Sequence, residues 1–137
     1  MSKIIPEIAV SSMEKSLAFY ELLGFVKTAD GVMDEQGSQW SGLALGDTSL
    51  WLTRQDIATG FRQDQARGNG ININVTVDDV DFVREKVAGS AYKGSVVRDI
   101  ETAYYGLRHF SIADPDGYIL TLNMQVAQQD AAWSATT

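Results

Sequence analysis

Two stretches of the chain carry the same order of hydrophobic and polar positions. Residues 8–25 ("IAVSSMEKSLAFYELLGF") begin with a short apolar run, continue with apolar residues at helical spacing and end near a glycine. Residues 73–90 ("INVTVDDVDFVREKVAGS") repeat this order about half a chain length later. Each stretch therefore predicts a strand that is followed directly by a helix.

The first predicted helix has recognisable ends and one apolar face. Ser11, with Glu14 three residues later, is typical of a capping box, and Gly24 stands where a C′ glycine would end the helix. Helical spacing predicts an apolar face made of Met13, Leu17, Tyr20 and either Leu23 or Glu21.

The second predicted helix repeats this plan. Asp78 or Asp79 can cap its start, and Gly89 ends it. Its apolar face consists of Val80, Val83 and Val87.

Three strand patterns follow each helix. In the first half they are "FVKTAD", "QWSGLALGD" and "TSLWLTRQ", of which the last two are joined by a tight turn at Gly46-Asp47. In the second half they are "GSVVRDI", "GLRHFSIAD" and "YILTLNMQV". The last two meet at the turn "DPDG", in which Pro115 presets φ and Gly117 accepts a positive φ. The predicted order is therefore βαβββ, twice.

The predicted fold class is α+β, with two βαβββ modules that form a cupped, mostly antiparallel sheet and carry their helices outside. One module alone buries too little apolar surface, so we expect a single domain over residues 1–137. The modules span about residues 3–55 and 71–126. Residues 56–70 form the linker, and residues 127–137 are expected to be a flexible tail.

Composition excludes several classes of function. The net charge is −7, and no basic patch is visible, which disfavours nucleic acid as a partner. The chain has no cysteine, which excludes disulfides, thiolate metal sites and a cysteine nucleophile. No apolar run is long enough to span a membrane, and the N-terminus has no secretory pattern, so we expect a cytoplasmic protein.

Two motifs together resemble the vicinal-oxygen-chelate superfamily, which includes glyoxalase I, extradiol dioxygenases and bleomycin-resistance proteins. They are "VSSMEKSLAFYELLGF" after the first strand and "GLRHFSIADPDGYILTL" near the end. The resemblance covers nearly the whole chain, from about Ile4 to Met124. It implies paired βαβββ modules around a shared concave face, and it implies a homodimer.

The resemblance also implies where a metal would be bound in this family. The matching positions on the inner strands are Ile5, Trp51, Asn72 and Thr121. None is a usual His, Glu or Gln ligand, because Ile5 and Trp51 cannot bind a divalent cation and the other two are weak neutral donors. We therefore expect no metal and no other cofactor, unless the alignment is displaced so that Glu7 and His109 join a different site.

Alternation along the strands predicts the lining of a mixed pocket. If the family positions face inward, the candidate binding residues are Glu7, Trp51, Asn72, Asn74, His109, Ser111, Thr121 and Asn123. Glu7 either faces the pocket or lies at a strand end near solvent. His109, the only histidine, either contacts a ligand or makes a structural hydrogen bond. Trp51 is either a stacking wall or part of the core.

Three further aromatic residues have a less specific pattern. Trp40, Tyr104 and Tyr105 could lie at the pocket mouth, but ordinary sheet and dimer packing is the favoured interpretation.

Two functions follow from these residues. The first is a metal-independent binding protein, similar to bleomycin-resistance proteins, that sequesters an antibiotic or another planar or cationic small molecule. The alternative is an enzyme of the same superfamily in which Glu7 and His109 act as a metal-free acid–base pair, as in a lyase or isomerase. A metal-dependent glyoxalase or dioxygenase is the weaker alternative.

Overall fold

Each predicted module forms a four-stranded mixed sheet with one helix against one of its faces. The computed structural model describes residues 2–126, and the chain divides into two units between Ala66 and Arg67. We call them the N-terminal unit and the C-terminal unit. The division falls within the segment predicted as the linker. The cup shared by both modules stays a prediction, because each unit is described by itself.

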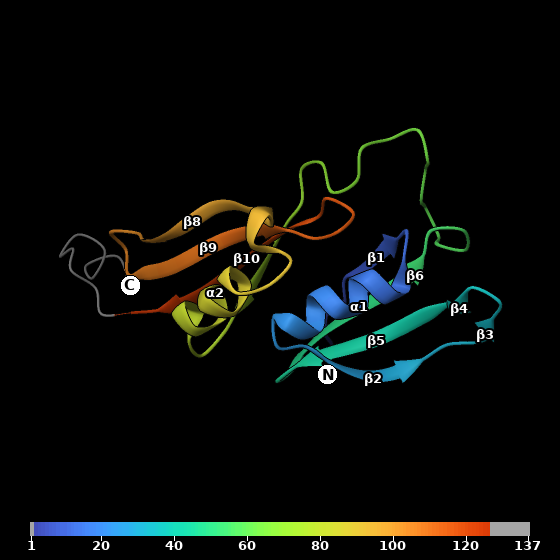
Figure 1. The fold of residues 1–137 in the computed structure, drawn as a ribbon, viewed down its shortest axis with the longest axis horizontal. Coiled ribbons are helices and arrows are strands. Elements are labelled where there is room, and N and C mark those ends of the chain that lie inside the picture. Colours follow the sequence, from blue (N-terminus) through green and yellow to red (C-terminus); the bar gives the residue numbers. More distant parts are fainter. Residues whose placement is uncertain (1, 127–137) are drawn as a thin grey trace. The chain divides into compact units, whose positions relative to one another are not determined.

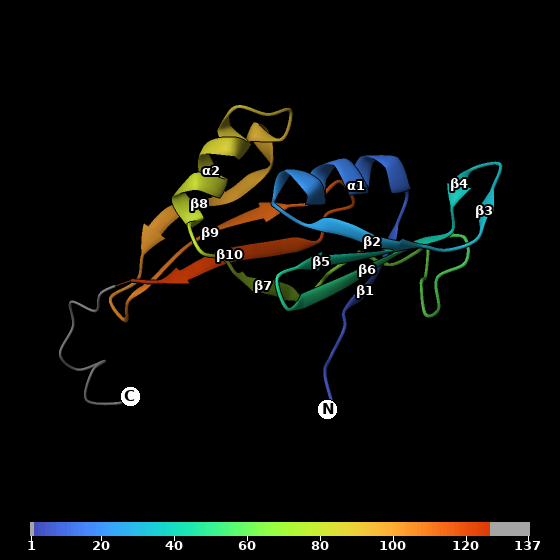
Figure 2. The ribbon, with the colours of Figure 1, turned by 90° about the horizontal axis from the view of Figure 1, so that it is seen from below.

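The N-terminal unit contains the first βαβββ module (Figure 1). Its elements are β1 (Glu7–Val10), α1 (Met13–Leu22), β2 (Val26–Asp30), β3 (Met33–Asp34), β4 (Gly37–Ser38), β5 (Trp40–Leu45) and β6 (Thr48–Arg54). The sheet order is β1-β6-β5-β2, with β1 parallel to β6 and the other neighbours antiparallel. The short strands β3 and β4 form a separate hairpin that extends beyond the ends of β2 and β5 (Figure 2).

The C-terminal unit repeats the module with the same strand order. Its elements are β7 (Asn72–Thr76), α2 (Val80–Ala88), a 3-10 turn (Lys93–Ser95), β8 (Val96–Thr102), β9 (Leu107–Ala113) and β10 (Ile119–Gln125). The sheet order is β7-β10-β9-β8, and here β7 and β10 form the parallel pair. The α+β class and the doubled βαβββ order predicted from the sequence are therefore confirmed.

Alternating side chains divide each sheet into a helix-covered face and an opposite face. In β6, Leu50 and Leu52 are buried on the face that packs against α1. In β10, Leu120 and Leu122 are fully buried, whereas the residues between and beyond them point to the other side. Apolar burial thus stabilises each unit on one face and leaves polar and aromatic side chains on the other.

The helix ends match the predicted residue types, with one correction. Ser12, not Ser11, is the N-cap of α1, because its Oγ accepts the backbone N–H of Lys15 at 3.2 Å. Gly24 has a φ of 110° and directly follows the C-cap Leu23, as expected of a C′ glycine.

The apolar faces of the helices are confirmed in part. Val80, Val83 and Val87 of α2 are all buried. In α1 the buried residues are Met13, Ser16, Phe19 and Tyr20, so the predicted Leu17 is only half-buried and Phe19 was missed. A ring contact between Phe19 and Tyr20, with centroids 5.1 Å apart, accounts for burying both neighbours.

The "DPDG" turn ties the first residues of the C-terminal unit to its sheet. Gly117 has a φ of 96°, and its N–H donates to the Asp114 carbonyl at 3.0 Å, as the turn chemistry predicts. The buried Asp116 carboxylate pairs with the Arg67 guanidinium. This ion pair fixes the point at which the linker segment becomes part of the unit.

The predicted tail, residues 127–137, lies outside the described residues. Within residues 2–126, neither helix has the length and apolar character needed to cross a membrane.

The cap of α2 offers a direct test of the helix assignment. Asp79 Oδ1 accepts the N–H of Phe82 at 3.1 Å, which settles the choice between Asp78 and Asp79. Asp79→Ala should lower the free energy of unfolding by about 1 kcal/mol, because it removes this bond. Asp78→Ala removes the same charge from the same helix end and should cost clearly less. Urea unfolding followed by circular dichroism measures both, and equal losses would show that charge alone is responsible.

Candidate functional site

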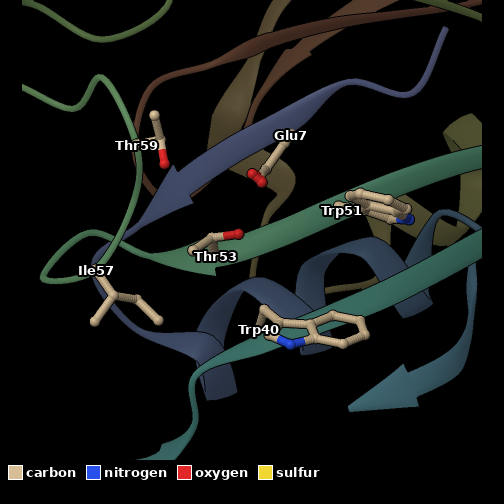
Figure 3. A pocket seen from close by; sticks show the side chains of 6 residues that line it. All are labelled: Glu7, Trp40, Trp51, Thr53, Ile57 and Thr59. Carbon is tan, nitrogen blue, oxygen red and sulfur yellow. The ribbon is translucent and has the colours of Figure 1, made fainter. Parts of the chain in front are cut away.

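A pocket of about 310 Å³ lies on the face of the N-terminal sheet that is opposite α1 (Figure 3). It is lined by Glu7 on β1, Trp40 on β5, Trp51 and Thr53 on β6, and Ile57 and Thr59 in the loop that follows. The volume lies at the small end of the range for ligand pockets.

Strand register places these side chains on one face. Glu7 is paired with Trp51 across the parallel strands, and Trp40 is paired with Thr53 across the antiparallel strands. Paired residues in neighbouring strands point to the same side of a sheet. Figure 3 shows the Glu7 carboxylate and both indoles on this common face.

The two indoles form one aromatic wall. The ring centroids of Trp40 and Trp51 are 6.4 Å apart, and the ring planes are tilted by 42°. Trp40 is 38% exposed and Trp51 is 44% exposed, so much of their surface is open to a ligand. Exposed aromatic faces of this kind attract planar rings by stacking and cations through the ring quadrupole.

Glu7 supplies the charge of the pocket. It is exposed at the first position of β1, and no Lys, Arg or His among residues 2–126 forms an ion pair with it. Glu7 therefore lies at a strand end near solvent and also lines the pocket of the N-terminal unit. A carboxylate beside two indole faces favours a cationic group.

A buried arginine fixes the loop that completes the pocket. Arg54, at the end of β6, is only 6% exposed, and its guanidinium binds both Asp34 of the β3–β4 hairpin and Asp56 of the loop. The backbone N–H of Ile57 also donates to the Arg54 carbonyl at 3.0 Å. Arg54 thereby holds the loop in place just before Ile57 and Thr59.

The other predicted binding residues lie on the C-terminal sheet, on the face opposite α2. Thr121 is central: its hydroxyl is 2.7 Å from the Ser111 hydroxyl and donates to the Asn72 side-chain oxygen at 2.9 Å. Next to them, the Thr76 hydroxyl donates to the Asn123 side-chain oxygen at 2.9 Å. Ser111, Thr121 and Asn123 are buried, while Asn72 and Asn74 are exposed on β7.

His109 occupies the same polar face in an unusual state. The residue is 9% exposed, and its Nδ1 is buried without a hydrogen-bond partner among the described residues. Its Nε2 lies 3.8 Å from a carboxylate oxygen of Glu101 on β8. Buried polar atoms usually have partners, so this Nδ1 departs from the general pattern.

The predicted residues thus fall into two groups. Glu7 and Trp51 meet at the N-terminal pocket, and Asn72, Asn74, His109, Ser111, Thr121 and Asn123 share one face of the C-terminal sheet. The sequence interpretation missed Glu101, Ile57 and Thr59. Trp40, for which sheet and dimer packing was the favoured interpretation, also lines this pocket. Its position opposite Thr53 in the hairpin was the signal that could have identified it.

Comparison with protein families decides the classification. The profile of the Glyoxalase/Bleomycin resistance protein/Dioxygenase superfamily matches residues 5–122. The chain belongs to this superfamily. A search of curated proteins finds no significant match.

Several solved structures are similar in fold. TioX from Micromonospora sp. ML1 has a TM-score of 0.69 and 16% identity, over 94% of this chain and 100% of that chain. TnmS3, an antibiotic-binding protein from Streptomyces sp. CB03234, has a TM-score of 0.67 and 27% identity, over 91% of this chain and 97% of that one. A bleomycin resistance determinant encoded on the transposon Tn5 has a TM-score of 0.64 and 18% identity, over 91% and 98%.

The residues at the four implied ligand positions do not fit a bound metal ion. At the implied ligand positions, Ile5 and Trp51 offer no suitable donor, and the Asn72 and Thr121 oxygens are hydrogen-bonded to each other. Within residues 2–126, no three His, Cys, Asp or Glu side chains come together as a possible metal site. No step of the proposed function therefore passes through a metal.

The ion pairs of Arg54 with Asp34 and Asp56 predict an unusual titration of Asp34. The guanidinium of Arg54 and the backbone N–H of Gln36 lower the pKa of Asp34 from 3.8 to about 2. Because the folded-state pKa is depressed, the stability that Asp34 contributes is complete above the ordinary pKa and is lost as the pH falls toward about 2. An NMR titration of the Asp34 carboxyl should show this low midpoint.

The matched variant for this titration is Arg54→Gln. Removing the guanidinium should return the pKa of Asp34 toward its ordinary value. A titration midpoint of Asp34 near 3.8 in the unmodified protein would show that the ion pair between Arg54 and Asp34 does not form.

Proposed function

We propose that the protein is a metal-independent small-molecule-binding protein that sequesters a planar or cationic ligand, such as an antibiotic. The observation that carries this proposal is the combination of two open indoles and an unpaired carboxylate in one pocket. Sequestration needs no chemistry from the protein, because a ligand held in the pocket is kept from its target.

Each element of the pocket has a separate role in binding. The faces of Trp40 and Trp51 stack on a ring, which contributes about 0.5–1.5 kcal/mol per aromatic pair beyond the buried area. Glu7 pairs with a positive charge on the ligand, and Thr53 and Thr59 offer hydroxyls at the margin. A small planar cation uses all of these contacts together, whereas a neutral or anionic molecule loses the carboxylate contact.

The similar proteins support this choice of function. TnmS3 is described as an antibiotic-binding protein, and the protein from Tn5 as a bleomycin resistance determinant. Their fold is the one found here. The proposal for this chain rests on its own pocket residues.

The polar face of the C-terminal sheet is a second set of candidate ligand contacts. Asn72, Asn74, Ser111, Thr121, Asn123 and His109 offer amide, hydroxyl and imidazole groups there. We propose that this face hydrogen-bonds polar parts of a ligand. We also propose the homodimer that the family resemblance implies, and analytical ultracentrifugation tests it.

Calorimetric titration with proflavine, a small planar aromatic cation, tests the pocket in buffer containing EDTA. Trp51→Ala should weaken binding about tenfold or more, because it removes one stacking wall. Glu7→Gln should weaken it about tenfold, because a charge-assisted contact becomes a neutral one.

Two controls make this test specific. Trp51→Phe keeps an aromatic face and should retain most of the affinity. Glu14→Gln makes the same charge change on the exposed side of α1 and should leave binding unchanged. If binding survives both Trp51→Ala and Glu7→Gln, the pocket has been misplaced.

An enzyme is the second candidate, and the place of His109 on the polar face of the C-terminal sheet favours it. Imidazole is the group most often used in general acid–base catalysis, and the Nε2 of His109 lies 3.8 Å from a Glu101 carboxylate oxygen, slightly beyond hydrogen-bond reach. Glu7, the predicted second member of the acid–base pair, belongs to the other unit. Mass spectrometry of a ligand after prolonged incubation distinguishes the functions, because sequestration returns the ligand unchanged. A product whose formation is lost in His109→Gln would support catalysis.

A further inference from the structure

Trp40 lies directly against the backbone of Gly31. The N–H of Gly31 donates to the Trp40 carbonyl at 2.7 Å, which continues the antiparallel pairing of β2 with β5 beyond Asp30 and Ser41. Gly31 and Trp40 are thus cross-strand neighbours at the end of this ladder. An aromatic side chain on one strand commonly folds over a glycine on the next, where no Cβ keeps it away.

The contact leaves no room for a side chain at position 31. A Cβ on Gly31 would overlap the Cδ1 and Nε1 atoms of the Trp40 indole and would lie 2.7 Å from Cγ. The backbone of Gly31 does not have a positive φ, so an alanine there meets no conformational penalty of its own. The requirement for glycine therefore comes from the indole.

A second glycine shows the contrast. Gly42, on β5 two residues after Trp40, lies at the other edge of the indole. A Cβ on Gly42 would be 3.7 Å from Cζ3 of Trp40, which is ordinary van der Waals contact. The Trp40 indole therefore excludes a side chain at Gly31 but not at Gly42, where the tightest neighbour of a Cβ would be the Thr28 hydroxyl at 3.3 Å.

We propose that Gly31 is a positioning residue: its bare Cα seats the Trp40 indole and thereby sets the opening of the pocket. This inference rests on the proposed function, because the pocket is the one to which we assign the ligand. Trp40 is 38% exposed, so the hydrophobic core does not hold it in place. The contact with the Gly31 backbone fixes the orientation of the Trp40 indole before a ligand binds.

The pocket geometry depends on the contact between Gly31 and Trp40 because the Trp40 indole lies beside Trp51 on its other side. The Trp51 centroid is only 6.4 Å from that of Trp40, so a displaced Trp40 either moves into the space for the ligand or swings away from it. Both movements remove a stacking wall. An effect on specificity therefore follows from a residue that does not itself touch the ligand.

The first test measures the indole pair without any ligand. Coupled tryptophans give an exciton couplet in far-ultraviolet circular dichroism, and Gly31→Ala should abolish it. Gly94→Ala in the C-terminal unit is the matched control, since a Cβ there meets nothing within 4 Å. A couplet that survives in Gly31→Ala overturns the inference.

A double-mutant cycle distinguishes the effect of the contact between Gly31 and Trp40 from a general loss of stability. Gly31→Ala should lower the urea midpoint in the unmodified protein but have little effect in Trp40→Ala, because the clash is then absent. Equal destabilisation in both backgrounds would contradict the role assigned to Gly31.

Proflavine titration then measures whether the contact between Gly31 and Trp40 affects ligand affinity. Gly31→Ala should weaken binding by about the same factor as Trp40→Ala, on the order of tenfold. Loss of the couplet with unchanged affinity overturns the positioning role. If the unmodified protein itself does not bind proflavine, the proposed function fails, while the couplet and the cycle still decide whether Gly31 seats Trp40.

Discussion

The register between β1 and β6 is the constraint on which the pocket depends. It places Glu7 opposite Trp51 and directs both side chains away from α1. Side chains alternate along a strand, so a shift of β1 by one residue would turn Glu7 toward the core and bring the buried Ile8 out into water. The cost of exposing such buried residues fixes the register. Hydrophobic burial on one face of the sheet therefore determines the chemistry of the other face.

The same division has a different result in the C-terminal unit. There the face opposite α2 carries a chain of hydrogen bonds from Ser111 through Thr121 to Asn72. Buried hydroxyl and amide groups are tolerated because they satisfy one another. His109 departs from this rule, since its Nδ1 has no partner among residues 2–126. The N-terminal unit offers aromatic surface and charge, and the C-terminal unit offers hydrogen-bonding groups.

Periodic features of the chain could be predicted from the sequence, whereas pairwise features could not. Alternation and cap residues located both βαβββ modules, and alternation placed Glu7 and Trp51 on one face of a sheet. The cap moved from Ser11 to Ser12 because neighbouring serines are equivalent in pattern, and only the bond to Lys15 distinguishes them. The β3–β4 hairpin was missed, since its two-residue strands have no periodicity and depend on the contact between Arg54 and Asp34.

The role proposed for Gly31 could not be predicted from the sequence for the same reason, because it depends on a cross-strand contact with Trp40. In the proposed function, Trp40 and Trp51 hold a planar cation without a metal. NMR of the indole N–H groups tests it most directly, with each signal assigned by Trp→Phe substitution and proflavine added in the presence of EDTA. Both signals should shift together and saturate with one binding constant. A complex that forms while neither signal moves, or that forms only when a divalent metal is added, would contradict it.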